Sequence, residues 1–153
     1  MVNLKLLKYL LFFVPLASLS VKAQNTSYRI LHLEMEGTSD VRMEMIVYCK
    51  KKKKITHEAK LAAVRTILYT GTGYGVFARP LIPDGEITSF QEHLYYLSNL
   101  YDYRLDDFIK YVDMASNYKK ADNNQGTHFI VCVKALQLRR DLEKNNVITK
   151  MGL

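Results

Sequence analysis

The chain has 153 residues, with 22 Lys and Arg against 15 Asp and Glu, a formal net charge of +7 and 48% hydrophobic residues. This composition excludes an intrinsically disordered tail, a collagen, a cysteine-rich miniature scaffold and a membrane protein of several spans. The length predicts about one domain and leaves little room for an enzyme with separate cofactor and substrate domains.

Residues 1–23 have the three parts of a secretory signal peptide. Two lysines give a positively charged start, residues 10–19 are an apolar stretch, and small residues stand where a signal peptidase reads them. We expect cleavage after Ala23, which leaves a single domain at 24–153. The apolar stretch is shorter than the roughly 20 residues of a membrane span. An N-terminal anchor that is not cleaved is the alternative.

Removal of this segment makes the basic character of the chain local. Residues 1–23 contain three lysines and no acid, so cleavage lowers the formal net charge from +7 to +4. Five remaining lysines are contiguous, Lys50–Lys54, and the rest of the mature chain carries −1. Charge gathered in one run does not make the basic face that nucleic acids bind. We expect an exported protein, periplasmic or extracellular, with no transmembrane span after cleavage and no nucleic-acid partner.

Alternating side chains predict a first β-hairpin. Residues 28–36 are typical of a strand, turn residues follow at 37–40, and residues 41–49 alternate between an apolar face and a mostly polar one. After the lysines, residues 57–69 show the alanine-rich apolar stripe of a helix that packs closely on a sheet. Gly71 is a typical residue to end that helix.

The second half of the chain repeats this order of elements. A connection with several Gly and Pro residues, 70–87, leads to a helix over 89–100 that begins with an S-x-x-E capping box. Strands are predicted at 108–118 and 127–134, on either side of a polar turn, and a last helix at 135–145.

Two hairpins, each followed by a helix, indicate an α+β fold in the order ββα-α-ββα. We expect a two-layer domain, with one antiparallel sheet and helices on one face of it. The alternative is that 88–107 forms a flexible flap beside a smaller sheet.

Cys49 and Cys132 are the only cysteines, and two interpretations of them stay open. An oxidising compartment permits a disulfide, which would stabilise the fold by about 4 kcal/mol in the chain-entropy model. The bridge requires neighbouring strands and side chains on one face. The other interpretation is two small buried side chains. The sequence has no CxxC and no Cys and His spacing of the kind that binds zinc.

The glycine-rich loop 71–75 does not predict a nucleotide site. Its pattern is GxGxG and it follows a helix, whereas the dinucleotide fingerprint is GxGxxG between a strand and a helix N-terminus. The C-terminal end of a helix dipole repels anions. We therefore expect no cofactor, and we interpret Tyr74 and Phe77 as aromatic contact residues on this loop.

The sequence shows no catalytic constellation. Its four histidines have neither HxxxH nor HExxH spacing, and no serine stands in a GxSxG turn. The acidic group Asp102, Asp106 and Asp107 is of a kind common on protein surfaces. We expect a protein that is not an enzyme, with no catalytic residue and no metal site.

Two segments are candidates for binding. Tyrosine is favoured at interfaces because one end of its side chain is apolar and the other polar. The predicted interaction surface consists of Tyr74, Phe77, Tyr95, Tyr96, Tyr101 and Tyr103, with ordinary core packing as the alternative.

The second candidate is an anion site where the lysine run meets a helix N-terminus. It would consist of Lys50, Lys51, Lys52, Lys53 and Lys54, and its ligands would be lipid headgroups, acidic polysaccharides or nucleic acid. A solvated loop of like charges is the alternative.

The signal peptide, the strand pair, KITHEAKLAAVRTILYTG at 54–71 and HFIVCVKALQLRRDLEKNNVI at 128–148 resemble a family of short exported Gram-negative proteins of unknown function. The pattern is also similar to small envelope α+β domains, such as the N-terminal domain of the flagellar assembly protein T. The resemblance implies an envelope or extracellular accessory role and assigns no functional residues.

These features together predict a non-enzymatic accessory protein of the cell envelope, which acts by contact with an unidentified protein partner. Weak contact with an anionic surface through the lysine run is the alternative function.

Overall fold

The structure is a computed structural model that describes residues 27–49, 51–115 and 126–150. The predicted signal peptide and the cleavage site after Ala23 lie outside these residues. The strands and α-helices are, in chain order, β1 (Ser27–Glu36), β2 (Asp40–Tyr48), α1 (Ile55–Arg65), α2 (Gly85–Glu92), α3 (Leu94–Asp102), β3 (Ile109–Met114), β4 (Thr127–Val133) and α4 (Ala135–Lys144).

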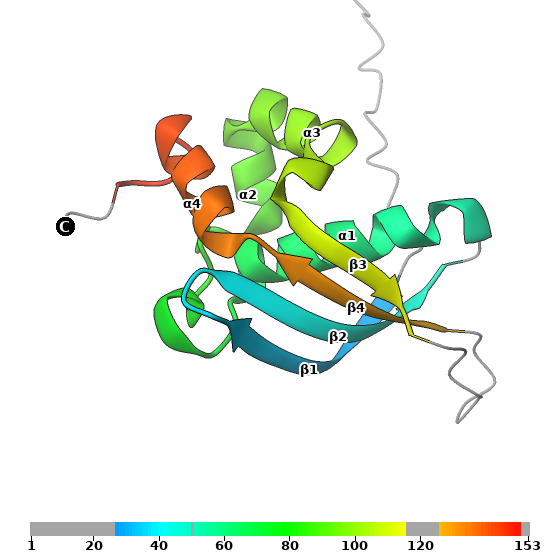
Figure 1. The fold of residues 1–153 in the computed structure, drawn as a ribbon. Coiled ribbons are helices and arrows are strands. Elements are labelled where there is room, and N and C mark those ends of the chain that lie inside the picture. The colour runs from blue at the N-terminus through cyan, green and yellow to red at the C-terminus, as the bar shows by residue number, and fades with distance from the viewer. Residues whose placement is uncertain (1–26, 50, 116–125, 151–153) are drawn as a thin grey trace, which may run out of the picture.

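The described strands form one antiparallel sheet in the order β1-β2-β4-β3 (Figure 1). Within each hairpin the two strands pair with each other, β1 with β2 and β3 with β4. The pairing of β2 with β4 joins the two hairpins. The predicted α+β class with an antiparallel sheet is confirmed. The predicted order of elements differs in one respect, because three α-helices rather than two separate the hairpins.

The two central strands supply the floor of the hydrophobic core. Across β2 and β4, Val41 faces Val133, Met43 faces Val131 and Met45 faces Phe129, and all six side chains are buried. These residues occupy every second position, so they all lie on the face of the sheet that the helices cover. The alternation seen in the sequence is therefore the alternation between the core and the open face.

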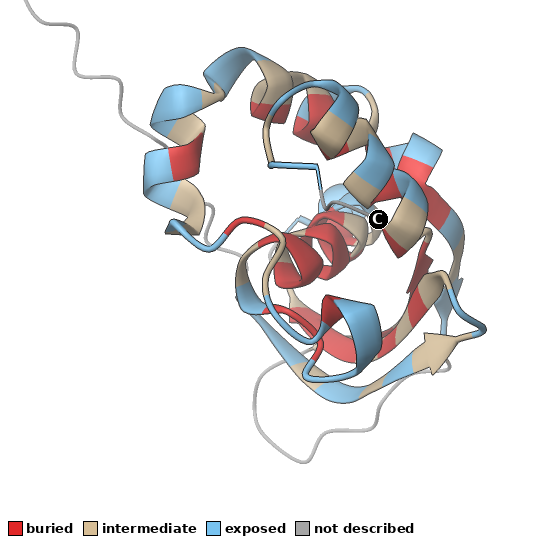
Figure 2. Cartoon of the chain, turned by 90° about the vertical axis from the view of Figure 1, so that its left-hand side faces the viewer, coloured by how far each residue is buried: buried red, intermediate tan, exposed pale blue. Residues whose placement is uncertain are grey.

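Helix α1 runs through the centre of the molecule, between the sheet and the helices α2 and α3 (Figure 2). Its buried residues lie on nearly all sides of the helix, which is expected of a helix that is covered on both sides. Alanines allow the close approach: Ala59, Ala62 and Ala63 are all at most 4% exposed.

The start of α1 differs from the prediction of a helix over 57–69. Lys52–Lys54 form a 3₁₀ turn that continues directly into the helix at Ile55, so the helix begins earlier than expected. Its regular part ends at Arg65, and a wider π-helical turn, Thr66–Thr70, completes it.

The π-helical turn anchors the connection that follows it. Gly71 N donates to Thr66 O at 2.8 Å, the spacing of a π turn. The carbonyls of Ile67 and Leu68 thus become free to accept hydrogen bonds of 3.2 and 2.8 Å from the backbone of the residues at 81 and 82. The glycine-rich connection is consequently fixed to the end of α1 at two points.

The predicted helix over 89–100 is two helices, α2 and α3, and the predicted capping box does not form. The chain breaks at His93, whose φ of −124° and ψ of 32° are not helical. Ser89 lies inside α2, and its hydroxyl donates to Gly85 O at 2.5 Å instead of capping a helix start. The described helices over 85–102 contradict the alternative of a flexible flap at 88–107 beside a smaller sheet.

The second hairpin has a shorter first strand than predicted. β3 ends at Met114, and the end of the predicted strand at 108–118 lies partly outside the described residues. β4 and α4 agree with their predictions to within one residue at each end. Val147 N donates to Leu142 O at 2.9 Å and so turns the chain back after α4.

Both edge strands are irregular. The pairing of β1 with β2 shifts between Ile30 and His32, and the pairing of β3 with β4 shifts between Ile109 and Tyr111. Each shift is a β-bulge, which adds one residue to the edge strand and increases its local twist. In β3 the bulge turns two consecutive side chains, Lys110 and Tyr111, toward acidic residues of the open face.

Both cysteines are free thiols. Cys132 is opposite Arg42, whose side chain lies on the open face of the sheet, whereas Cys49 continues the core-facing positions of β2 and packs against the core. The two thiols therefore lie on different faces, which excludes a disulfide between them in this fold. The second interpretation of the sequence, two small buried side chains, holds for Cys132, whereas Cys49 is only partly buried.

Candidate functional site

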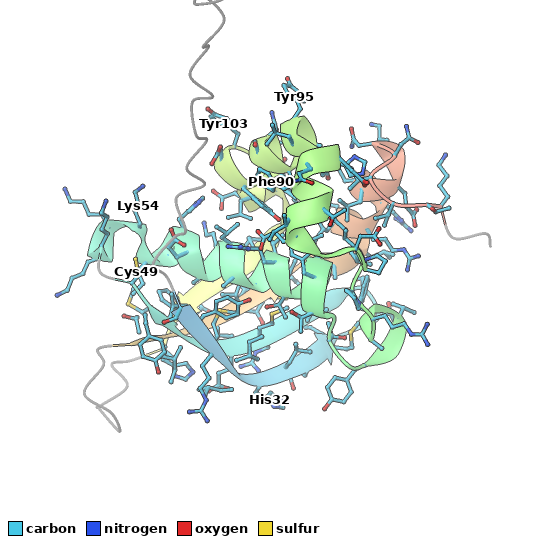
Figure 3. All side chains as sticks on the ribbon, turned by 180° about the vertical axis from the view of Figure 1, so that it is seen from behind. His32, Cys49, Lys54, Phe90, Tyr95 and Tyr103 are labelled. Carbon is cyan, nitrogen blue, oxygen red and sulfur yellow. The ribbon has the colours of Figure 1, made fainter. Side chains whose placement is uncertain are left out.

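Exposed apolar side chains gather on the helices α2 and α3. Nine large apolar residues are exposed on the described part of the chain, and four of them lie between positions 87 and 103. Tyr95 and Tyr103 are labelled at the end of the molecule farthest from the sheet (Figure 3). We call these four residues the α2–α3 surface: Ile87 (79% exposed), Leu94 (55%), Tyr95 (88%) and Tyr103 (83%).

A cavity of about 480 Å³ opens beside Tyr95. It lies where α2 meets α3 and where the segment after α4 passes them, so apolar and hydrogen-bonding groups share its walls. Its lining consists of Glu92, His93, Leu94, Tyr95, Tyr96, Asn99, Arg104 and Asn145.

One wall of this cavity is held by a charged hydrogen-bond cluster around Asp141. The Tyr96 hydroxyl donates to Asp141 Oδ2 at 2.6 Å. Two guanidinium nitrogens of Arg104 donate hydrogen bonds to the same carboxylate, at 3.0 and 3.2 Å. The guanidinium also lies 5.5 Å from the centre of the Phe108 ring. A two-point contact between guanidinium and carboxylate fixes geometry as well as charge. These contacts fix the positions of Tyr96 and Arg104 in the cavity wall.

The pKa values in the cluster agree with this picture. Burial opposes ionisation of Asp141, but hydrogen bonds from Arg104 and Tyr96 outweigh it and lower the pKa of the carboxyl. Burial, together with the bond to Asp141, raises the pKa of the Tyr96 phenol well above its usual range. Asp141 is thus a permanent anion at neutral pH, and Tyr96 a permanent donor to it.

The six residues of the predicted interaction surface differ in burial. Phe77 and Tyr101 are buried, at 0% and 8% exposure, so their assignment to a surface is wrong. Tyr101 packs in the core because α3 turns its 97, 100 and 101 positions inward, and its hydroxyl lies 2.9 Å from that of Tyr69. Phe77 fills the core beneath the glycine-rich loop.

The other members of that predicted surface do not form one patch. Tyr95 and Tyr103 belong to the α2–α3 surface, and Tyr96 lines the neighbouring cavity. Tyr74 is 61% exposed, but it stands on the loop before Gly75–Phe77, beside the end of β1. Sequence reasoning missed Ile87 and Arg104, and no motif marks either residue.

Backbone N–H groups of the glycine-rich loop donate hydrogen bonds to acceptors within the loop and the turn that follows it. Thr72 N donates to Phe77 O, Gly73 N to Ala78 O, and Tyr74 N to the Thr72 hydroxyl, at 2.8 to 3.2 Å. These are the groups that would have to point outward to cradle a phosphate. The loop is a closed structural connection.

The lysine run lies away from the α2–α3 surface, at the start of α1 (Figure 3). Lys51–Lys54 are exposed, and no acidic side chain of the described residues forms an ion pair with them. Lys50 lies outside the described residues. The helix start at Lys54 has no side-chain cap. The structure therefore leaves a compact positive patch at this end of the molecule.

The open face of the sheet carries a polar network around Glu36. Hydrogen bonds from Tyr111, at 2.5 Å, and from Lys110, at 2.9 Å, lower the pKa of Glu36 to about 2. The bond to Glu36 raises the pKa of Tyr111 to about 12, and burial raises that of the Cys132 thiol to about 12. A nucleophile at neutral pH needs a lowered pKa. The network therefore supports the fold rather than nucleophilic chemistry.

Comparison of the chain with protein-family models, with curated proteins and with solved structures found no match. Within 27–49, 51–115 and 126–150, no three His, Cys, Asp or Glu side chains are grouped so as to hold a metal ion. In the same part of the chain, no helix has the length and apolar character needed to cross a membrane.

Proposed function

We propose that the protein is an exported, non-enzymatic accessory protein of the cell envelope, which binds a partner protein through the α2–α3 surface and the cavity beside it. The observation that carries the proposal is the exposure of Tyr95 and Tyr103, at 88% and 83%, at one end of the molecule. Exposed tyrosines beside a preorganised polar wall are typical of protein interfaces.

Burial of these side chains is the source of the binding free energy. Covering a large apolar side chain contributes about 1.5–3 kcal/mol, and a few central anchors usually dominate an interface. Tyr95 lines a cavity together with Arg104, whose position is fixed by Asp141. A partner that inserts an apolar side chain there would bury Leu94 and Tyr95 together.

Export is the second part of the proposal. The first described strand begins at Ser27, four residues after Ala23, so cleavage there removes none of the described strands and helices. Fractionation of the native host, followed by mass measurement of the protein, tests it. We expect a chain that lacks residues 1–23, outside the cytosol. An intact chain in the cytosol contradicts this part of the proposal.

Site-specific photo-crosslinking in the native host tests the binding surface. A photoreactive phenylalanine analogue is placed at Tyr95 or Tyr103, and for comparison at Tyr74, which is also exposed, on the glycine-rich loop. We expect one discrete crosslinked species from the first two positions and none from Tyr74, with the partner identified by mass spectrometry. Equal crosslinking from all three positions, or none from Tyr95 and Tyr103, contradicts the assignment.

The exposed lysines favour a second candidate function, contact with an anionic membrane surface. Each Lys near such a surface contributes about 1 kcal/mol at moderate salt. Sedimentation with vesicles that contain anionic lipid should fall steeply as salt is raised. Replacing Lys51–Lys54 with Gln should abolish it, and binding that survives the replacement contradicts this candidate.

A further inference from the structure

A second cavity, of about 500 Å³, shares Arg104 with the lining of the first. One face of α4 forms much of it, together with the chain that precedes β3. Its lining consists of Arg104, Asp107, Phe108, Lys134, Gln137, Arg140, Asp141 and Lys144. Arg104 therefore lines both this cavity and the one beside Tyr95.

The lining of the second cavity carries excess positive charge. Its two acids, Asp107 and Asp141, both make ion pairs with Arg104, at 3.3 and 3.0 Å. Lys134 donates only to the backbone carbonyl of Asp107, at 3.0 Å. Arg140 and Lys144 are exposed and form no ion pair with an acid of the described residues.

The excess is concentrated on one face of α4. Lys134, Gln137, Arg140 and Lys144 follow one another at spacings of three or four residues, so their side chains lie along one line of the helix. The opposite face of α4 carries the core residues Leu138 and Leu142. An elongated ligand lying along α4 would meet the cations in succession.

We propose that the partner protein presents an acidic segment with a bulky apolar residue, whose carboxylates lie along α4 while the apolar side chain enters the cavity beside Tyr95. This inference rests on the proposed function and names the chemistry of the partner. Charge complementarity selects carboxylates for the Arg140 and Lys144 side, and Leu94, Tyr95 and Tyr96 in the mixed lining of the first cavity favour an apolar group on the other side. Because Arg104 lines both cavities, one short segment can present both groups.

A labelled peptide probe tests this inference without the native partner. The probe is a short run of glutamates with a phenylalanine at its centre, and its binding is followed by fluorescence anisotropy. We expect the double substitution Arg140→Gln and Lys144→Gln to weaken binding about tenfold, as for two exposed charge contacts. Raising the salt concentration should reduce binding to the unsubstituted protein.

The matched control removes the same charge elsewhere, by Lys52→Gln and Lys53→Gln in the exposed run before α1. Both double variants change only exposed side chains, so we expect both to fold. Circular dichroism and thermal unfolding check this. The inference holds if the α4 variant loses affinity and the control does not. Absence of binding, equal losses, or a loss confined to the lysine-run variant overturns it.

A second probe, with alanine in place of the phenylalanine, tests whether the two cavities act together. We expect weaker binding of this probe, and equal binding of the two probes overturns the joint site. The crosslinking at Tyr95 does not depend on charge. If that crosslink forms while the α4 variant binds the probe normally, the proposed function stands and this inference alone fails.

Discussion

The hydroxyl of Tyr111 donates a 2.5 Å hydrogen bond to Glu36, although the two residues stand on the two opposite edge strands of the sheet. Lys110 joins the same network by binding both Glu36 and Asp40 at 2.9 Å. The bulge in β3 turns both Lys110 and Tyr111 toward this point. Side chains of β1, β2 and β3 thereby meet above the central strands and shield Cys132, which is fully buried.

We predict that Glu36→Gln makes the stability of the protein less dependent on pH. The folded state lowers the pKa of Glu36 from 4.5 to about 2. Its contribution is therefore complete above about pH 4.5 and is lost as the pH falls toward about 2. Urea unfolding should show the variant less stable at neutral pH and equal to the unsubstituted protein near pH 2. A loss of equal size at every pH, or a similar effect of the exposed control Asp102→Asn, contradicts the assignment.

Gly71 is predicted to accept a side chain only at a large cost in stability. Its φ is +77°, and a Cβ would lie 2.6 Å from Ala78 O and 2.8 Å from Pro80 N. Left-handed strain and a backbone clash together give a loss of about 3 kcal/mol for Gly71→Ala. Gly73→Ala is the control, since Gly73 has a φ of +74° with nothing within 4 Å of the new Cβ. Strain alone should cost the control about 1 kcal/mol, and equal losses in chemical denaturation would contradict the close packing at Gly71.

The aromatic residues of the loop should behave in opposite ways. Phe77 is 0% exposed and Tyr74 is 61% exposed, although only three positions separate them. We predict a loss of about 3–5 kcal/mol for Phe77→Ala, typical of a large side chain removed from a core. Tyr74→Ala should change the free energy of unfolding by less than about 0.5 kcal/mol. Urea denaturation of both variants measures the contrast, and similar values for the two would refute the burial of Phe77.

The two thiols should differ in reactivity. Cys49 is partly exposed, whereas Cys132 is buried and burial raises the pKa of its thiol to about 12. Because the thiolate is the reactive form, iodoacetamide should modify Cys49 in the folded protein and Cys132 only after unfolding in urea. Mass spectrometry reads out the label, and Cys49→Ser is the control that should leave the folded protein unlabelled. A folded protein that takes no label before reduction would instead indicate a disulfide.

The hairpins were predictable because their signal is local. Alternation in 41–49 reports directly on which side chains face the core, and each hairpin pairs strands that are neighbours in sequence. The break at His93 was not predictable in this way. It resets the phase of the helix, so that α3 buries Leu97, Leu100 and Tyr101 while Leu94 is 55% exposed.

The candidate site was predictable only in part, for a related reason. A count of tyrosines locates a region rich in them but does not show which way each one points. Tyr95 and Tyr101 differ in exposure because they lie on different faces of α3, which packing decides. Arg104 and Asp141 are 37 residues apart, and only the tertiary fold brings them together.

The bulge in β1 also bears on how the protein avoids joining with copies of itself. A long edge strand offers its unpaired backbone groups to any passing strand, and a kink with charged neighbours is a common defence. β1 has its kink between Ile30 and His32, flanked by Arg29 and Glu34. We therefore expect this edge to resist strand-by-strand aggregation, so that a concentrated preparation stays free of fibrils.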